Sequence, residues 1–207
     1  LYTVSQDGAT CTVSCSLCQK VLETLTLLKP ACKTYGDGKS CEVAVLVNDV
    51  LVTDISDQVY FRWENGQWNK LEAAPTNAGT YRAEIYNVGD PYDTADDFTL
   101  YVEYTIAKAK LTITAEDNTI TYGDAPAANG VTGNGFVGSD SFTDLSGELT
   151  YSYNYEQFGN VGTYKITPGG LTSGNYKITF ADGTLIVNAK TITVTAYAVQ
   201  ADGFEDK

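Results

Sequence analysis

The chain has 207 residues, 43% of them hydrophobic, and its 26 acidic against 13 basic residues give a formal net charge of −13 at pH 7. This charge argues against binding to nucleic-acid phosphates and against docking on an anionic membrane. Because the chain has no histidine, Ser-His-Asp catalysis, Cys-His catalysis and histidine-ligated metal sites are excluded too. No pattern of residues predicts an enzyme.

The length fits one large domain or two domains of about 100 residues each. The apolar runs are short, and none approaches the roughly 18 residues that a membrane span requires, so we expect no membrane insertion. Position 1 is Leu, and no basic segment followed by an apolar run comes after it. We therefore expect a mature product or an excised fragment.

The five cysteines lie in the first fifth of the chain, at Cys11, Cys15, Cys18, Cys32 and Cys41. Cys32 and Cys41 flank a turn-rich stretch, and a disulfide closing this loop would stabilise the fold by about 2–3 kcal/mol. We expect this pairing, and a second bridge with one leftover thiol among the other three. A thiolate zinc site at Cys15-x-x-Cys18 would need a second ligand pair. Clustered cysteines in an acidic chain favour an oxidising, extracellular location.

Two segments have some helical character, Leu17 to Leu25 and Asp140 to Leu145. Apolar residues recur with helical spacing in the first, but Thr24 and Thr26 favour a strand, so both conformations stay open for it. Elsewhere Thr, Val, Ile and Tyr dominate the periodic segments, while Gly, Asn and Asp separate them. This pattern is typical of an all-β chain.

The segment from Tyr60 to Trp68 predicts a β-hairpin. Asn65-Gly66 suits a two-residue type I′ turn, which places Trp63 opposite Trp68. Tyr60, Trp63 and Trp68 are then the candidate ligand-binding residues, as an aromatic platform on which sugar rings could stack. The alternative, which we favour, is that this face belongs to the core or to a partly covered sheet.

The loop from residue 87 to 97 carries four carboxylates, at Asp90, Asp93, Asp96 and Asp97. Calcium prefers oxygen ligands of this kind, so these four are the candidate metal site. The loop lacks the residue order of an EF-hand, and a solvated acidic loop is the favoured alternative. The same two interpretations apply to Asp140, Asp144 and Glu148. We expect no other cofactor.

A second hairpin is predicted from Tyr176 to Val187. Its Asp182-Gly183 pair favours a type I′ turn, which would place Phe180 opposite Leu185 and give one apolar face.

Three short patterns recur in the same order along the chain. Thr34-Tyr35-Gly36-Asp37 returns 87 residues later as Thr121-Tyr122-Gly123-Asp124. The Asn-x-Gly-Thr-Tyr pattern occurs at 77–81 and at 160–164, and Ala-Lys at 109–110 and at 189–190. The chain therefore holds a first copy of one unit at about 24–109 and a second copy at about 110–189, and a third begins at Lys190. In the Asn-x-Gly-Thr-Tyr pattern we expect a tight turn and a core tyrosine rather than a ligand motif.

These landmarks make residues 110–189 similar to the MBG domain, the "mostly beta, glycine-rich" repeat of bacterial surface proteins. The matching segments are Thr121–Asp124, Gly135–Asp140, Asn160–Tyr164, Ser173–Tyr176 and Gly183–Val187. Residues 24–109 resemble the related Ig-like stalk repeats, although their cysteines depart from the usual cysteine-free pattern. The resemblance implies a large secreted or wall-attached protein, often an adhesin, in which such repeats form a stalk without catalytic residues.

We therefore expect an all-β fold of two tandem small β-sandwich (Ig-like) or β-grasp-like modules in an elongated arrangement. Residues 1–108 form an Ig-like module with a cysteine-rich edge, 109–190 an MBG-like module, and 191–207 the start of a further repeat or a tail. The expected role is a structural stalk of a secreted or cell-wall-attached bacterial adhesin that spaces a distal binding domain from the cell.

Two alternatives are a carbohydrate- or mucin-binding module and an accessory domain of a secreted hydrolase. The expected partners are host glycan or mucin, reached through the parent protein, and the chain itself should be a monomer.

Overall fold

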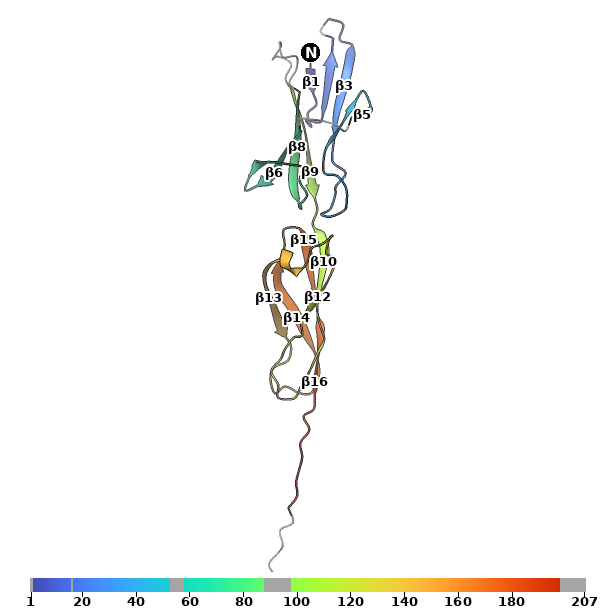
Figure 1. Cartoon of the computed structure of the whole chain (residues 1–207). Helices are drawn as coiled ribbons and strands as arrows, with labels where there is room; N and C mark the ends of the chain where they lie inside the picture. The colour runs from blue at the N-terminus through green and yellow to red at the C-terminus, as the bar shows by residue number, and fades with distance from the viewer. Residues whose placement is uncertain (1, 16, 53–57, 88–97, 198–207) are drawn as a thin grey trace, which may run out of the picture. The chain divides into compact units, whose positions relative to one another are not determined.

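The computed structural model describes the chain except residues 1, 16, 53–57, 88–97 and 198–207. Its described part consists of strands and one short 3-10 helix, without an α-helix, which confirms the predicted all-β class (Figure 1). Its several sheets agree with the predicted β-sandwich modules. No helix in the described part is long and apolar enough to cross a membrane.

In the part of the chain before residue 108 that the structure describes there are nine strands: β1 (Tyr2–Val4), β2 (Thr10–Ser14), β3 (Val21–Leu28), β4 (Ala44–Val47), β5 (Val50–Val52), β6 (Gln58–Glu64), β7 (Gln67–Leu71), β8 (Gly79–Asn87) and β9 (Phe98–Ile106). Seven more follow among the described residues: β10 (Ala109–Ala115), β11 (Asn118–Thr121), β12 (Val131–Asn134), β13 (Ser146–Tyr153), β14 (Gly162–Thr172), β15 (Tyr176–Ala181) and β16 (Gly183–Asn188). The 3-10 helix is η2 (Phe142–Asp144).

By their contacts the residues group into two compact units. The first comprises residues 1–113, 133–149 and 170–179, and the second comprises residues 114–132, 150–169 and 180–207. The predicted module boundaries at 108/109 and 190/191 stay predictions.

Two antiparallel sheets enclose the core of the first unit. One has the strand order β1-β2-β3-β4-β5 and the other β7-β6-β8-β9. Side chains at every second position of β8 and β9 are buried, as the two-residue period of a strand requires. These core residues are Tyr81, Ala83, Ile85, Leu100, Val102, Tyr104 and Ile106. Cys11, Leu27 and Val45 from the five-stranded sheet join the same hydrophobic cluster.

The later strands form a three-stranded sheet, β12-β10-β15, and a four-stranded sheet, β11-β16-β14-β13. In the second sheet β11 pairs with β16 in parallel, whereas β14 pairs with β16 antiparallel. The core of the second unit consists of Ala115, Tyr155, Ile166, Leu185 and Val187. Ala115 lies on β10 while Ile166 and Leu185 lie on β14 and β16, so side chains from both sheets meet in one core.

The predicted hairpin from Tyr176 to Val187 is wrong. β15 and β16 lie in different sheets, so Phe180 and Leu185 are not paired. Neither Asp182 nor Gly183 adopts the positive φ that a type I′ turn needs. The Asp182 carboxylate instead accepts hydrogen bonds from Lys165 Nζ at 2.7 Å and from Thr167 Oγ1 at 2.6 Å, which hold it against β14.

The two segments with helical character also have definite structures. The first contains the start of strand β3, which begins at Val21. The second contains η2, a single 3-10 turn in which Ser141 and Asp144 cap each other's backbone as a capping box. Local polar capping thus accounts for the weak helical pattern there.

Candidate functional site

The predicted tryptophan hairpin is formed as expected. β6 and β7 pair with Trp63 opposite Trp68, and Asn65 and Gly66 have φ values of 54° and 82°. The two indole rings lie 5.0 Å apart at an interplanar angle of 61°. Since 45% of Trp63 is exposed, the pair forms an accessible aromatic surface on the four-stranded sheet.

Tyr60 does not share this surface. It lies three residues before Trp63 on β6 and therefore points to the opposite face of the strand, where it is buried. Its hydroxyl accepts the N–H of Val43 and donates to Gln58, and burial raises its pKa. The structure thus brings together two of the three predicted ligand-binding residues and places the third in the core.

Strands β8 and β9 add charged groups beside the tryptophans. The Arg82 guanidinium lies 4.7 Å from the Trp68 ring centroid and 4.7 Å from that of Tyr101. Its Nη2 donates to Glu103 Oε1 at 2.6 Å. A hollow of about 310 Å³ is lined by Trp63, Trp68, Thr80 and Glu103. An aromatic wall beside a carboxylate can stack on a sugar ring and accept hydrogen bonds from its hydroxyls.

The predicted calcium loop with Asp90, Asp93, Asp96 and Asp97 lies outside the described residues. Within the described ranges no group of three or more acidic or cysteine side chains could hold a metal ion. Calcium binding therefore stays a prediction.

The Cys32–Cys41 disulfide is present, with Cα atoms 5.1 Å apart. The expected second bridge is not formed. Cys11 is free and buried in the core, while Cys15 and Cys18 are also free, and the Cys18 N–H donates to Cys15 Sγ at 3.5 Å.

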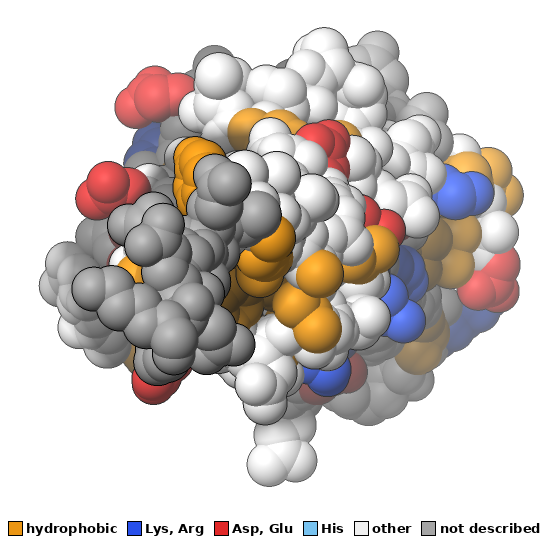
Figure 2. Space-filling view, turned by 90° about the horizontal axis from the view of Figure 1, so that it is seen from below, with side chains coloured by type: hydrophobic (Ala, Val, Ile, Leu, Met, Phe, Trp, Pro, Cys, Tyr) orange, Lys and Arg blue, Asp and Glu red, His pale blue; other side chains and the backbone are white. Residues whose placement is uncertain are grey.

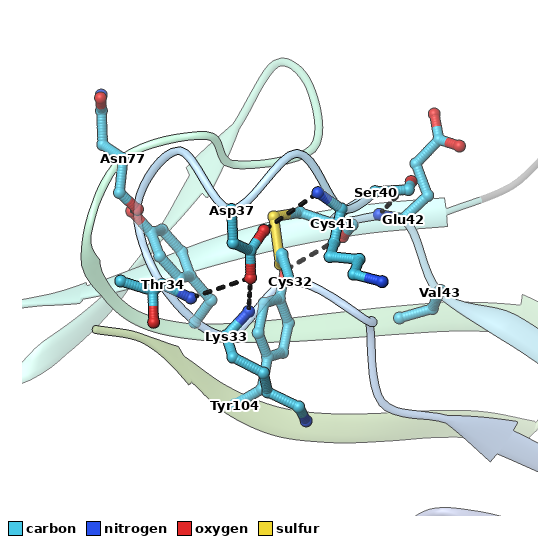
Figure 3. The surroundings of a disulfide bond; sticks show 12 residues. Cys32, Lys33, Thr34, Asp37, Ser40, Cys41, Glu42, Val43, Asn77 and Tyr104 are labelled. Atoms are coloured by element: carbon cyan, nitrogen blue, oxygen red, sulfur yellow. Dashed lines mark hydrogen bonds between the residues drawn. A yellow bond between two sulfur atoms is a disulfide. The ribbon is translucent and has the colours of Figure 1, made fainter. Parts of the chain in front are cut away.

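The loop that the disulfide closes is organised around the Asp37 carboxylate (Figure 3). Asp37 Oδ2 accepts the backbone N–H groups of Lys33 at 2.7 Å and Thr34 at 3.1 Å, and Oδ1 accepts that of Lys39 at 3.0 Å. These bonds, from Lys33 first, lower the pKa of Asp37. The carboxylate and the disulfide therefore fix the same loop.

The second Thr-Tyr-Gly-Asp segment repeats this turn. Asp37 N–H donates to the Thr34 carbonyl, and Asp124 N–H donates to the Thr121 carbonyl. The Tyr35 N–H donates to the carbonyl of Ala107 at 2.8 Å, and the Tyr122 N–H to that of Asn188 at 2.8 Å. Thr34 and Ala107 form a parallel bridge, as Thr121 and Asn188 do in β11 and β16. The sequence repeat is thus a repeat of one hydrogen-bonded turn.

The Asn-x-Gly-Thr-Tyr segments also match each other. The Tyr81 hydroxyl donates to the Asn77 carbonyl at 2.8 Å, and the Tyr164 hydroxyl to the Asn160 carbonyl at 2.7 Å. Each tyrosine packs against a second tyrosine ring, Tyr104 at 5.8 Å and Tyr155 at 4.9 Å. These contacts give the pattern the structural role that the sequence predicts.

Comparison with protein families matches residues 111–186 to the MBG domain, YGX type. Residues 111–186 are an MBG domain. The Tyr122-Gly123 pair lies within the matched range, as do the Thr121–Asp124 turn and the bond from the Tyr164 hydroxyl to the Asn160 carbonyl. Comparisons with curated proteins and with solved structures find no significant match. MBG domains occur in surface or secreted proteins.

Part of the MBG domain belongs to the first compact unit and there contacts the Tyr35 turn. The Asp140 carboxylate accepts hydrogen bonds from the hydroxyls of Tyr35 at 2.8 Å and Tyr176 at 2.5 Å. The two tyrosine rings meet edge to face with centroids 5.5 Å apart. The bond from Tyr176, followed by that from Tyr35, lowers the pKa of Asp140. Burial and the bond to Asp140 raise the pKa of Tyr176 to about 12.

Asn175 of the MBG domain forms the other half of this contact. Its Nδ2 donates to Asn77 Oδ1 at 2.9 Å, and its Oδ1 accepts the Ala78 N–H at 3.0 Å. A Cβ on Gly36 would lie 2.0 Å from Val137 Cγ1, so glycine is required for this approach. We call Tyr35, Asn77, Asp140, Asn175 and Tyr176 the joint cluster.

Proposed function

We propose that the chain is a stalk segment of a secreted or cell-surface bacterial protein, an adhesin, in which repeated β units space a distal binding domain from the cell. The observation that carries the proposal is the repetition of one turn in two successive copies, with the same backbone hydrogen bonds at Tyr35 and Tyr122. Repeating a small folded unit lengthens a protein without creating an active site.

The structure of the first copy supports an extracellular setting. The Cys32–Cys41 disulfide persists in oxidising compartments and constrains the unfolded chain. The net charge of −13 keeps such a segment soluble and opposes lateral association of neighbouring copies.

Surface display tests the spacer role. Residues 1–207 are placed between a cell-surface anchor and a reporter binding domain, and capture of ligand-coated beads by intact cells is measured. We expect more capture than with the reporter fused directly to the anchor, because the inserted units move it away from the cell surface. A flexible Gly/Ser linker of equal length is the control. Capture equal to that of the direct fusion would contradict the spacer role.

A second candidate function is glycan binding at the tryptophan hollow, which the exposure of Trp63 and the nearby Glu103 favour. The chain has two tryptophans, and both lie in this pair, so intrinsic fluorescence reports on the hollow alone. We expect mucin glycans or polysaccharides to quench the emission and Trp63→Ala to weaken binding about tenfold, as loss of a stacking contact of about 1.4 kcal/mol implies.

Tyr86→Phe is the control for this titration, because Tyr86 is an exposed aromatic residue on β8 that does not line the hollow. Binding by this variant should equal that of the wild type. Unchanged emission across a panel of glycans at millimolar concentration would exclude this candidate.

A further inference from the structure

The second copy presents the surface that the joint cluster covers in the first. Val161 occupies the position of Ala78 in the Asn-x-Gly-Thr-Tyr pattern, yet 52% of Val161 is exposed against 5% of Ala78. Tyr122, which corresponds to Tyr35, is 40% exposed, and Phe158 is 67% exposed. We call Tyr122, Phe158, Asn160 and Val161 the end surface. Figure 2 shows hydrophobic side chains exposed on the face of the molecule seen from below.

The space beside Gly123 on the end surface corresponds to the space beside Gly36 at the joint cluster. In the first copy the space above Gly36 is filled by Val137. The corresponding Gly123 has φ +98°, and the nearest atom to a Cβ at this position would be Phe158 Cε1 at 3.8 Å. A side chain like that of Val137 therefore has an open place beside Gly123.

The segment that follows each copy is also similar, because Ile192 and Val194 lie four and six positions after Asn188, as Leu111 and Ile113 lie after Ala107. After Ala107 accepts the Tyr35 N–H, the chain enters β10 at Ala109, whose N–H donates to the carbonyl of Asn175. After Asn188 accepts the Tyr122 N–H, the chain repeats Ala-Lys at 189–190. Residues 191–197 form no strand, and their apolar residues Ile192 and Val194 are exposed. Polar and apolar residues alternate from Thr191 to Val194, as they do in a strand that packs one face against a sheet.

We propose that the end surface is the docking surface for a further copy of this module, which the chain enters through residues 190–194. The incoming copy supplies an aspartate to the Tyr122 hydroxyl, an asparagine amide to Asn160 and the Val161 N–H, and a branched apolar side chain over Gly123. These are the groups that Asp140, Asn175 and Val137 supply in the first joint.

The chemistry favours a copy of the module over an unrelated partner. The chain is acidic, so two such bodies repel each other unless short-range polar contacts and covalent linkage bring them together. A copy that continues from Lys190 is held at a high effective concentration beside the end surface. The three side chains that it must carry come from two separate segments of the MBG domain, Val137 and Asp140 from one and Asn175 from the other, which an unrelated partner would not present together.

The inference is tested in a chain in which residues 1–191 are followed directly by residues 111–207, so that Leu111 of the new copy follows Asn188 by four positions, as Leu111 follows Ala107 after the first copy. The two parts are joined by intein ligation with ¹⁵N in residues 1–191 only, and amide hydrogen exchange is measured by NMR. We expect exchange at Val161 to slow at least about tenfold relative to the chain of 207 residues, since its amide gains the bond that Ala78 makes to Asn175.

Two variants in the appended copy separate docking from other effects. Asn175→Ala there should restore the exchange rate of Val161, whereas Asn134→Ala, at an exposed position of β12, should not. Reverse labelling shows whether the appended copy is folded. Resonances of Tyr122 and Val161 that superimpose on those of the original chain would overturn the inference, as would an appended copy that fails to fold.

This inference deepens the proposed spacer role and rests on it, because only a spacer built from repeated units calls for a further copy. The two are separable, because failure of the added copy to dock leaves the display result unaffected, and failure of the display leaves the hydrogen-exchange result unaffected.

Discussion

Replacing Cys32 and Cys41 with serine is expected to lower the free energy of unfolding of the first unit by about 2–3 kcal/mol. The bridge joins residues with a sequence separation of 9, and opening it returns conformational entropy to the unfolded chain. The native loop also loses a covalent tie beside the buried Tyr104, whose hydroxyl donates to the Cys41 carbonyl at 3.5 Å. Urea denaturation followed by tryptophan fluorescence measures the change, because both tryptophans lie in this unit.

Cys18→Ser is the matched control for the double substitution. Cys18 is an exposed, free cysteine in the turn before β3, so the stability of this variant should equal that of the wild type. A reducing agent should act on the wild type as the double substitution does and should leave the double variant unchanged. Equal stability of the wild type with and without reductant would show that the bridge does not stabilise the native fold.

The features that local sequence predicts correctly depend on short-range geometry. The Asn65-Gly66 turn determines the Trp63–Trp68 register by itself, because both residues must adopt positive φ and the flanking strands follow. The Thr-Tyr-Gly-Asp repeat likewise predicts a repeated turn, since the aspartate bonds to backbone groups three or four residues before it. Such contacts are encoded within a few residues and can be inferred from them.

The features that the sequence did not predict depend on contacts between distant segments. Glu103 of β9 lines the tryptophan hollow, and Arg82 of β8 lies beside Trp68 and donates to Glu103. Only the strand order β7-β6-β8-β9 brings them there. The alternation of apolar residues on β8 could have shown that Arg82 shares a face with Glu84, but not which strand it meets. Tyr60 lies three positions before Trp63 on β6, and the two-residue period of a strand places it on the other face.

The failed hairpin at Asp182-Gly183 shows how one dipeptide can serve two structures. In a type I′ turn the glycine adopts a positive φ. Gly183 does not adopt a positive φ, and its lack of a side chain instead allows close approach of another backbone segment. A Cβ at this position would lie 2.4 Å from the Ala115 carbonyl oxygen and 3.0 Å from that of Glu116. The chain passes from one sheet to the other at this point, and the close backbone approach to β10 permits it.

Gly183→Ala is therefore expected to destabilise the MBG domain by about 2–3 kcal/mol, at the upper end of the usual range for overpacking, because the opposing atoms are backbone and cannot rotate away. Gly174→Ala is the matched control, since a Cβ on Gly174 would have no neighbouring atom within 4 Å and the φ of this residue is not positive. Calorimetry of the full chain measures both variants.

Gly183→Asn separates the two roles of the glycine. In a type I′ turn asparagine is well tolerated, so a hairpin would make this variant milder than Gly183→Ala. Against the Ala115 carbonyl the larger side chain must be at least as harmful as alanine. A melting temperature for Gly183→Asn above that of Gly183→Ala would therefore support the hairpin. It would contradict the position of β16 between β11 and β14, and with it the parallel pairing of β11 and β16 next to the repeated turn.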